Sequence, residues 1–484
     1  ALCLMLLLYL QKQFIMTFPI CIGGEFMQTA RTLDVTCSYD GSLVGTTFLA
    51  GQPQLEKAIK MAEEVRTEMK EMPSWKKYDI LIKSASALRL HKDEMAKIIA
   101  GEAAKPLKLA LGEVDRAIQT FEVAAEESRR VAGEFMKIDW TQAGSGKEAI
   151  IKYFPAGIVS GISPFNFPLN LAIHKIAPAI AAGCPIILKP SRNTPLSMLY
   201  MAQLMAESGL PKGALSVLPL DRECGNQMVT DPRFAVLTFT GSPEVGWKMK
   251  TDAGKKKVVL ELGGNAGVVI DKSADLNVAV PKVLAGAFAY AGQVCIHTQR
   301  IFVHEEIFDA FAKAFAEATS KLKMGSPFSA DTDISSMIDE ANAIRVESWV
   351  QDAVKDGAKI LCGGRRTGAA FEPTVLIDTK PEMNVCCMEI FGPVVTLEKF
   401  SDYKQAIQQV NDSRFGLQAG VFTDSLEHMK YAFNTLDVGG VMINEVPTFR
   451  VDHAPYGGIK DSGLGREGVK YAMMDYMEMK ILVY

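Results

Sequence analysis

The sequence predicts an α/β protein built around parallel β-sheets, and three observations support this prediction. The chain has 484 residues, of which 48% are hydrophobic, enough for a large buried core and two or three domains. Between residues 156 and 264, short apolar segments alternate with helical stretches, and a second alternation follows Gly263 and Gly264. Strands separated by helices pair in parallel, are covered on both faces, and bind ligands at their carboxyl ends.

The elements follow from hydrophobic periodicity. Residues 54–133 are predicted to be helical, because apolar residues such as Leu81, Ala85 and Leu88 recur at helical spacing. The first sheet is predicted from strands 157–162, 186–189, 215–218, 235–239 and 258–262, separated by helices 170–182, 195–208, 222–230 and 243–252. The second unit is predicted from strand 266–270, helix 275–291, strand 300–304, helices 307–321 and 340–356, and strands near 359, 374 and 394.

Two segments stand apart from this alternation. Residues 137–154 place Gly144 and Gly146 between two polar–apolar alternations, which predicts a β-hairpin, and residues 477–484 form a candidate terminal strand. An isolated hairpin is marginally stable in water. We therefore expect the hairpin and the tail to pair with another surface or another subunit.

Composition excludes several classes of function. The 52 basic and 56 acidic residues are mixed and give a net charge of -4, so no basic stripe indicates nucleic-acid binding. Nine cysteines without a Cys-x-x-Cys pattern indicate a reducing compartment. The six scattered histidines offer no metal pattern, and adjacent Cys386 and Cys387 are interpreted as core or strand residues, so we expect no metal.

The first fifteen residues are interpreted as a leader from upstream or from cloning, without a functional role. Ala1 to Leu10 is an apolar run too short to span a bilayer, it lacks the features of a signal peptide, and Met16 resembles a natural start. A peripheral membrane anchor is the alternative interpretation. The rest of the sequence has no membrane-spanning pattern, so we expect a cytoplasmic protein that does not bind membranes.

Cys295 and Glu261 are the first candidate catalytic residues. Cys295 lies 34 positions after Glu261, and a thiol nucleophile together with a carboxylate base could form and hydrolyse a thioester. The alternative is that Cys295 is an inert buried residue, as many cysteines are.

Three further features fall where the predicted first sheet would bind a ligand. Residues 239–246 end a strand and open a helix with glycines that allow phosphate approach, or they form an ordinary turn. Lys189 ends a strand and could hold ribose hydroxyls or phosphate, or it could be solvated. Asn166, between two prolines, could stabilise an oxyanion or cap a helix.

Together these segments resemble the NAD(P)-dependent aldehyde dehydrogenase superfamily, from about Ile22 to the C-terminus. The resemblance rests on six motifs in family order and spacing: Pro-Phe-Asn-Phe-Pro at 164–168, Lys-Pro-Ser at 189–191, Phe-Thr-Gly-Ser at 239–242, Leu-Glu-Leu-Gly-Gly at 260–264, Gly-Gln-x-Cys at 292–295, and Glu-Ile-Phe-Gly-Pro at 389–393. The chain most resembles the lactaldehyde and semialdehyde members.

The resemblance implies the domain organisation. It implies an aldehyde-dehydrogenase-like fold with a Rossmann-type five-stranded NAD(P)-binding domain from residues 16–136 and 156–264. A second α/β catalytic domain would cover residues 265–469. A small β element for oligomerisation would comprise residues 137–155 and 470–484, giving a homodimer or homotetramer.

The resemblance also implies the roles of individual residues. Cys295 would attack the aldehyde, Asn166 and the Cys295 N–H would hold the oxyanion, Glu261 would activate water, and Lys175 would relay protons. NAD or NADP would be bound by Ile162, Pro164, Lys189, Ser191, Arg192, Gly241, Ser242, Gly264, Glu389 and Phe391.

Cofactor and substrate preference are predicted from departures within these motifs. Relatives that prefer NAD often carry glutamate where this chain has Arg192, so we predict that NADP is accepted; the alternative is an arginine turned to solvent. Arg450 and His453 precede Pro455 in a segment similar to the family's substrate-facing loop. They indicate a small polar or anionic aldehyde, or they are structural loop residues.

Three other functions compete with hydrolytic oxidation. An acylating enzyme would pass the thioester to coenzyme A, but relatives of that kind commonly lack the glutamate that Glu261 matches. A catalytically silent relative would be expected to have lost Cys295 or Asn166. A thiol redox sensor often has a resolving cysteine beside the reactive one, and Val294 and Ile296 flank Cys295 instead.

Overall fold

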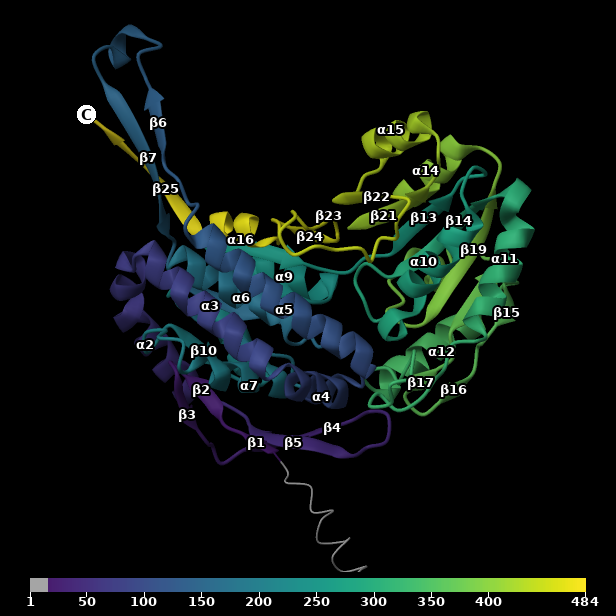
Figure 1. Cartoon of the computed structure of the whole chain (residues 1–484), viewed down its shortest axis with the longest axis horizontal. Coiled ribbons are helices and arrows are strands. Elements are labelled where there is room, and N and C mark those ends of the chain that lie inside the picture. Colours follow the sequence, from purple (N-terminus) through teal and green to yellow (C-terminus); the bar gives the residue numbers. More distant parts are fainter. Residues whose placement is uncertain (1–15) are drawn as a thin grey trace, which may run out of the picture.

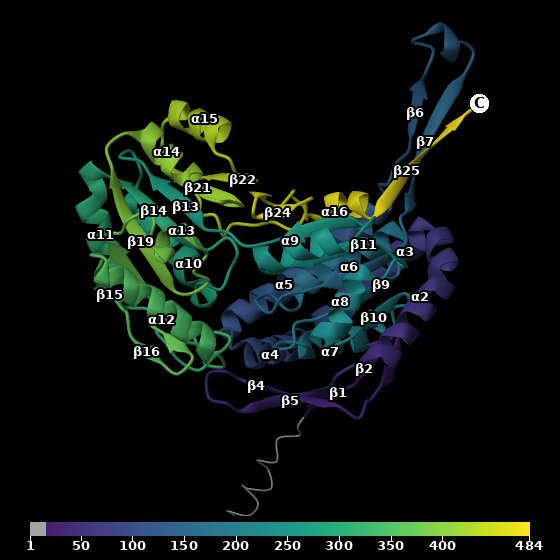
Figure 2. The same cartoon turned by 180° about the vertical axis from the view of Figure 1, so that it is seen from behind.

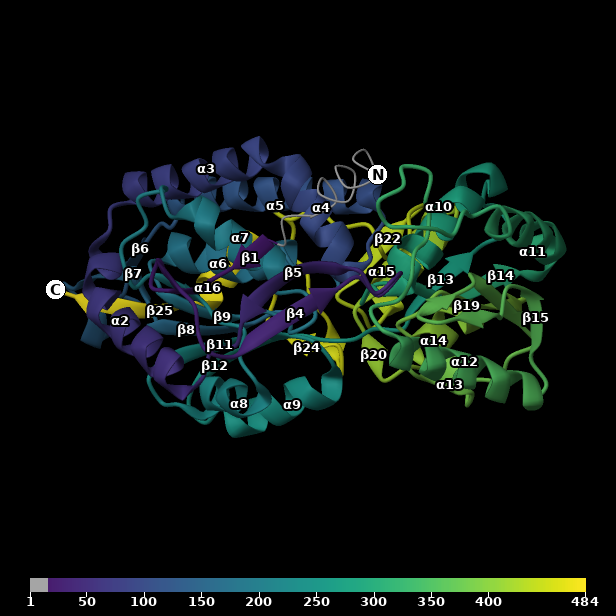
Figure 3. The same cartoon turned by 90° about the horizontal axis from the view of Figure 1, so that it is seen from below.

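The computed structural model describes residues 16–484, so the prediction for residues 1–15 lies outside the described residues. Two α/β halves lie beside each other, and a narrow β arm projects from the first half (Figure 1; Figure 2). The view from below shows the helices and strands of each half around its own sheet (Figure 3). The predicted α/β class with parallel sheets is therefore confirmed.

The first half contains the five predicted parallel strands: β8 (Ile158–Ile162), β9 (Ile186–Lys189), β10 (Leu215–Val217), β11 (Phe234–Thr240) and β12 (Lys257–Glu261). Between them lie the four predicted helices: α6 (Asn170–Ala182), α7 (Leu196–Met205), α8 (Arg222–Thr230) and α9 (Pro243–Asp252). The strand order β12-β11-β8-β9-β10 brings the carboxyl ends of β8, β11 and β12 side by side.

The sheet is wider than the five strands expected. Antiparallel strands β2 (Ile20–Ile22) and β3 (Glu25–Met27) extend one edge beyond β10, and β24 (Gly463–Leu464) pairs with β12 at the other. These strands are two or three residues long, too short for alternating hydrophobicity to reveal them.

Four helices precede the five parallel strands, as predicted for residues 54–133: α2 (Gln52–Glu71), α3 (Ser74–Leu90), α4 (Lys92–Ala103) and α5 (Leu107–Ser128). In α5, Ala110, Val114, Ala117 and Phe121 recur on one face and are fully buried. These residues belong to the same hydrophobic core as residues of α6 and α7, and this core holds α5 against the sheet. A small sheet in the order β1-β5-β4 borders this half and consists of β1 (Met16–Phe18), β5 (Leu43–Phe48) and β4 (Thr32–Thr36).

The second half has a seven-stranded sheet in the order β15-β18-β19-β14-β13-β21-β22. Its strands are β13 (Ala266–Ile270), β14 (Thr298–His304), β15 (Lys359–Cys362), β18 (Thr374–Ile377), β19 (Val394–Phe400), β21 (Gln418–Phe422) and β22 (Gly440–Ile443). Its helices are α10 (Leu276–Phe288), α11 (Glu305–Thr319), α12 (Glu340–Lys355), α13 (Asn384–Cys387), α14 (Tyr403–Asn411) and α15 (Leu426–Thr435). Two short pairs complete it: β16 (Arg366–Thr367) with β17 (Ala370–Phe371), and β20 (Phe415–Gly416) with β23 (Ile459–Lys460).

Three details differ from the sequence prediction. Strands β21 and β22 were not predicted. The helix predicted to reach residue 291 ends at Phe288, and a short 3₁₀ segment, η2 (Ala289–Gly292), follows. Cys386 is a core residue as predicted, but Cys386 and Cys387 lie in the short helix α13 rather than in a strand.

The projecting arm consists of β6 (Glu134–Lys137), a 3₁₀ turn η1 (Gln142–Gly144), β7 (Glu148–Pro155) and the terminal strand β25 (Met477–Val483), which follows helix α16 (Val469–Asp475). The predicted hairpin and terminal strand are therefore present. They pair with each other, in the order β25-β7-β6, and β25 matches β7 along its whole length. The terminal strand β25 therefore pairs with a strand of its own chain.

The domain boundaries proposed from the sequence stay a prediction. Strand β24 lies within the segment assigned to the catalytic domain, yet it joins the sheet of the first half. No helix within residues 16–484 combines the length and the apolar character needed to cross a bilayer.

Candidate active site

A cavity of about 640 Å³ lies between the two halves, at the carboxyl ends of the first sheet. Ile162, Lys189, Thr240 and Glu261, which end β8, β9, β11 and β12, all line it. From the second half come Cys295, Glu389 and Phe391, among others. Of the sixteen predicted site residues, the cavity lining includes Ile162, Pro164, Asn166, Lys189, Ser191, Arg192, Gly241, Ser242, Glu261, Cys295, Glu389 and Phe391.

The loop that carries Cys295 has an unusual backbone. Tyr290 and Ala291 both adopt φ of 51°, a left-handed conformation that non-glycine residues rarely take. Gly292 follows at φ of 67°, where a Cβ atom would collide with the carbonyl oxygen of Gly392. Such strain persists only where surrounding contacts enforce it. One such contact is the hydrogen bond that the Tyr290 hydroxyl donates to the Ala103 carbonyl at 2.7 Å.

Cys295 borders the cavity, and within residues 16–484 its side chain has a single hydrogen-bond partner. Its sulfur lies 3.0 Å from the hydroxyl oxygen of Tyr456, and either atom could be the donor. Burial raises the pKa of Cys295 to about 11, and the Tyr456 hydroxyl opposes this shift. At neutral pH the sulfur is therefore mainly a thiol, and its activation requires a base or a change in the local field.

Asn166 lies beside the nucleophile loop. Its side-chain amide donates to the Gln293 carbonyl at 3.0 Å, and its own carbonyl accepts from Lys105 at 2.6 Å. Helix α6 begins only at Asn170, with Leu169 at the N-cap position, so Asn166 is not a helix cap. The alternative role of Asn166 suggested by the sequence is therefore wrong.

A buried ion pair fixes this region. Lys105 forms an ion pair with Glu113, and both side chains are almost fully buried. The Lys105 ammonium also lies over the rings of Phe167 and Tyr290, 3.9 Å and 4.6 Å from their centroids. It therefore links the backbone of Asn166 to the nucleophile loop.

Glu261 is buried and has no hydrogen bond to either carboxyl oxygen within residues 16–484. Burial raises the pKa of Glu261 well above its ordinary value, the nearby Glu467 raises it further, and Arg450 and Lys175 lower it. Gly457 lets the backbone approach closely, because a Cβ there would lie 2.9 Å from Glu261 Oε1. A buried, unpartnered carboxylate facing a cavity is suited to accept a proton.

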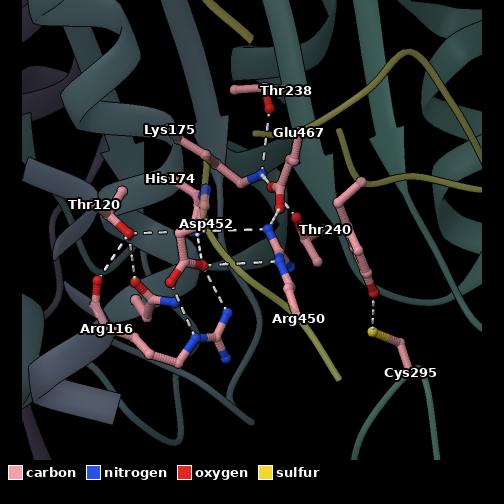
Figure 4. A network of polar contacts seen from close by, with 12 residues as sticks. Arg116, Thr120, His174, Lys175, Thr238, Thr240, Cys295, Arg450, Asp452 and Glu467 are labelled. Carbon is pink, nitrogen blue, oxygen red and sulfur yellow. Dashed lines mark hydrogen bonds and ion pairs between the residues drawn. The ribbon is translucent and has the colours of Figure 1, made fainter. Parts of the chain in front are cut away.

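A network of buried charges lies to one side of Cys295 (Figure 4). Lys175, on α6, donates to the Thr240 hydroxyl at 2.7 Å and lies 3.5 Å from Glu467. Glu467 also accepts from Arg450 at 2.8 Å. Burial alone raises the pKa of Glu467, but the Lys175 and Arg450 cations outweigh it and hold the pKa at about 2.

The same network continues to Asp452, which sits among three basic side chains. Arg116 donates to both of its carboxyl oxygens, at 2.7 and 3.1 Å, and His174 lies at 2.7 Å. Arg450 lies 3.8 Å from the Asp452 carboxylate. Burial lowers the pKa of His174, so this imidazole is mainly neutral. Three cationic side chains thus face two ionised carboxylates when Lys175 is protonated.

On the other side of the cavity lie the predicted cofactor residues. Ser242 is the N-cap of α9, and its side chain makes no capping hydrogen bond, so the helix N-terminus is open to an anion. Glu389 accepts from the Gly264 backbone at 2.9 Å, and burial raises the pKa of Glu389 to about 8. Phe391 has φ of 44° and packs edge-to-face on Phe165 at 5.8 Å.

The two residues predicted to contact substrate lie in different surroundings. Arg450 is buried within the charge network, whereas His453 is exposed and does not line the cavity. Lys175 does not line the cavity but lies next to Glu261. Gly264 does not line it either, and its backbone N–H donates to Glu389. Arg192 is exposed, and it lines this cavity and a second one of about 960 Å³.

The sequence prediction missed Tyr456, Glu467, Asp452, His174 and Arg116. One local signal existed: His174 and Lys175 occur in the middle of an otherwise apolar helix. Buried polar groups require partners, so their presence indicates a polar network. Nothing in the sequence identifies which distant residues form it.

Comparisons with known proteins fit this geometry. The model of the aldehyde dehydrogenase family matches residues 26–482. The 3-sulfolactaldehyde dehydrogenase of Priestia megaterium is 40% identical over 467 residues, covering 96% of this chain and 98% of the relative. The lactaldehyde dehydrogenase of Methanococcus aeolicus is 38% identical and covers 96% and 99%. These matches confirm the resemblance found in the sequence.

Solved structures agree with these matches. Aldehyde dehydrogenase 21 of Physcomitrella patens, in complex with the reaction product succinate, superposes with a TM-score of 0.96, at 45% identity over 97% of this chain and 98% of that one. The glyceraldehyde-3-phosphate dehydrogenase GapN of Methanocaldococcus jannaschii, complexed with NADP, gives a TM-score of 0.90, at 36% identity over 94% and 100%. The aldehyde-dehydrogenase-like fold is confirmed.

The charge network predicts a pH-dependent stability contribution from Glu467. In Glu467→Gln, Arg450 and Lys175 lose their carboxylate, and removing one partner of a buried ion pair costs about 3–5 kcal/mol. The native pKa of about 2 lies below the ordinary 4.5. The stabilisation is therefore complete above pH 4.5 and is lost as pH falls towards 2.

Thermal unfolding of both proteins between pH 7 and pH 3 measures this effect. We expect a constant deficit in the variant above pH 4.5 and a shrinking one below. Glu478→Gln is the control, because its carboxylate forms an exposed pair with Lys257 and should change little. A deficit that grows below pH 4.5 contradicts the prediction.

Proposed function

The chain belongs to the aldehyde dehydrogenase family, and on that premise we propose that it oxidises a small polar aldehyde to its carboxylate by way of a Cys295 thioester. It is an NAD(P)-dependent enzyme, and its structural neighbours include complexes with NADP and with NAD+. The observation that carries the mechanism is the convergence of Cys295, Asn166 and Glu261 on one cavity together with the predicted cofactor residues.

In the first step the Cys295 thiolate attacks the aldehyde carbon, and a carbon–sulfur bond forms as the carbonyl oxygen becomes an oxyanion. The Asn166 amide and the Cys295 backbone N–H would donate to that oxyanion. Asn166 is held for this role by Lys105, through its carbonyl, and by Gln293, through its amide. A preorganised donor needs little rearrangement during the reaction.

A bound NAD(P)+ would supply the hydride acceptor that converts the thiohemiacetal on Cys295 to a thioester. Glu261 would then take a proton from water as the water attacks the thioester carbon. The carbon–sulfur bond breaks, and the Cys295 thiolate and the carboxylic acid are released. The proton would then pass from Glu261 towards Lys175, which lies beside it and whose pKa is lowered by burial.

The residues present fit a dinucleotide. The cavity offers an open helix N-terminus at Ser242 for a pyrophosphate. Gly241 lies against the ring of Phe239, where a Cβ would collide, so glycine keeps this turn narrow. Lys189 lines the cavity, its ammonium forms no hydrogen bond or ion pair within residues 16–484, and burial lowers its pKa. Lys189, Ser191 and Arg192 would hold the adenosine ribose, while Glu389 and Phe391 would position the nicotinamide end.

Charge supports a polar or anionic substrate. Arg116 and Arg450, which belong to the charge network beside Cys295, would favour an aldehyde that carries a second, negatively charged group. Arg116 is partly exposed, Arg450 is buried, and His453 lies on the surface. The names of the relatives, which include a sulfolactaldehyde enzyme and a succinate complex, agree with such a substrate.

We also propose a homodimer or homotetramer in the cytoplasm. The arm formed by β6, β7 and β25 leaves apolar side chains exposed, among them Phe135, Met479, Ile481 and Leu482. Exposed apolar strands of this kind are suited to pairing with a second copy. Residues 137–155 and 470–484 would then form the oligomerisation element, beside the NAD(P)-binding and catalytic domains proposed from the sequence.

A panel of short aldehydes tests the function. We expect reduction of NADP with lactaldehyde, succinate semialdehyde or a sulfonate aldehyde, and a lower kcat/KM for the uncharged propionaldehyde. Cys295→Ser should lower the rate by a factor on the order of 10³ or more, because it removes the nucleophile. Cys387→Ser, in helix α13, is the matched control and should retain activity. Full activity in Cys295→Ser would rule the mechanism out.

Glu261→Gln separates hydrolysis from acyl transfer. Without the base, each site should form one thioester and release one equivalent of NAD(P)H, and further turnover should slow about 10²- to 10⁴-fold. Stopped-flow absorbance of the reduced cofactor measures the burst and the slow phase. If coenzyme A accelerates turnover of the unmodified enzyme and an acyl-coenzyme A accumulates, the acylating alternative is correct instead.

Arg192→Glu tests cofactor preference. A carboxylate at this position should repel a 2′-phosphate and lower the ratio of kcat/KM for NADP over NAD by roughly 10- to 100-fold. Lys212→Glu reverses another exposed cation and serves as the control. A strong preference for NAD that persists unchanged in Arg192→Glu contradicts a role for Arg192.

A further inference from the structure

Tyr456 contacts the nucleophile directly, although no role has been assigned to it so far. Only 5% of its surface is exposed, and it packs in a small apolar cluster with Val294, Ile296 and Leu417. Its hydroxyl oxygen lies 3.0 Å from the Cys295 sulfur. No other hydrogen bond of this hydroxyl occurs within residues 16–484.

The position of the phenol is fixed from two directions. The Tyr456 and Glu467 backbones exchange two hydrogen bonds, with N···O distances of 3.0 and 2.6 Å. The Arg450 guanidinium lies 3.8 Å from the centroid of the Tyr456 ring, and Glu467 binds the same guanidinium at 2.8 Å. One residue, Glu467, therefore holds both the backbone of Tyr456 and the cation on its ring.

We propose that Tyr456 is a further catalytic residue, whose hydroxyl donates a hydrogen bond to the Cys295 thiolate and thereby stabilises the nucleophile before attack and the leaving sulfur after hydrolysis. The proposal rests on the proposed function, because it requires Cys295 to be the nucleophile. Arg450 supports the donor, since a cation over the ring draws electron density from the phenol and strengthens its O–H bond dipole.

The direction of the hydrogen bond follows from the two acidities. Burial holds the pKa of Tyr456 well above its ordinary value, so the phenol keeps its proton. Once Cys295 loses its proton, the sulfur can only accept. The other charged groups that face Cys295 are Glu389 and Glu261, which raise its pKa, and Arg450, which lowers it.

Loss of this hydrogen bond has a measurable signature. A hydrogen bond to a charged group is strong enough to shift a pKa by about one unit. A thiolate that is one unit more basic is also more nucleophilic, by about threefold, because nucleophilicity follows basicity with a slope of about 0.4–0.5. Without the hydroxyl, alkylation should therefore slow about threefold below the thiol pKa and accelerate about threefold above it.

Tyr456→Phe tests the proposal, because it removes the hydroxyl and keeps the ring for Arg450. The full-length enzyme is mixed rapidly with iodoacetamide between pH 6 and pH 11.5, and modification of the Cys295 peptide is followed by mass spectrometry. Thiolate absorbance near 240 nm, corrected with Cys295→Ala, gives the midpoint independently. We expect the midpoint to rise by about one unit, so that alkylation is about threefold slower below the midpoint of the unmodified enzyme and this difference closes towards pH 11.5.

Two controls make the outcome decisive. Tyr403→Phe removes a buried hydroxyl in the second half, which donates to the His428 carbonyl at 3.0 Å, and should leave the profile unchanged. A merely structural role for Tyr456 would slow alkylation at every pH with a fixed midpoint. That result, or an unchanged profile, overturns the proposal. If Cys295→Ala instead retains dehydrogenase activity, the proposed function fails, whatever the midpoint of Tyr456→Phe.

Discussion

The ion pair between Arg450 and Glu467 is the contact on which the candidate active site depends. Both side chains are buried, and an ion removed from water loses several kcal/mol of solvation unless it is paired. Glu467 also binds Lys175, and its backbone binds that of Tyr456. Movement of either partner would break a buried ion pair, so this pair ties the segment that follows Phe449 to helix α6 and to the surroundings of Cys295.

The opposite side of the nucleophile is held by different means. The left-handed residues Tyr290 and Ala291 store strain, of order 1–3 kcal/mol each, that only enforced contacts can maintain. Lys105 supplies such contacts by binding the Asn166 carbonyl and lying over the Tyr290 ring. Cys295 therefore lies between two rigid supports, which keeps the Asn166 amide and the sulfur in a fixed relation. Such a fixed relation is what oxyanion stabilisation requires.

The sequence predicted the features that depend on local pattern. Lys189 ends one predicted parallel strand and Asn166 follows another, and the rule that such strands bind ligands at their carboxyl ends placed both residues at the cavity. What it could not predict depends on contacts between distant segments. Strand β24 pairs with β12, which lies about 200 residues earlier in the chain. Arg450 binds Glu467, the partner of Lys175, and does not line the cavity. The polar pair His174–Lys175 within apolar α6 indicated that partners exist, without identifying them.

The basicity of Glu261 follows from the same charge network. Its carboxyl group is buried without a hydrogen-bond partner within residues 16–484, an arrangement that disfavours the ionised form. Glu467 disfavours it further, whereas Lys175 and Arg450 favour it. A carboxylate with a raised pKa is a stronger base than one exposed to water, and a general base works best when its pKa approaches the working pH. The pair that fixes the geometry of the site therefore also sets the proton affinity of the residue proposed to activate water, so that position and reactivity depend on the same buried charges.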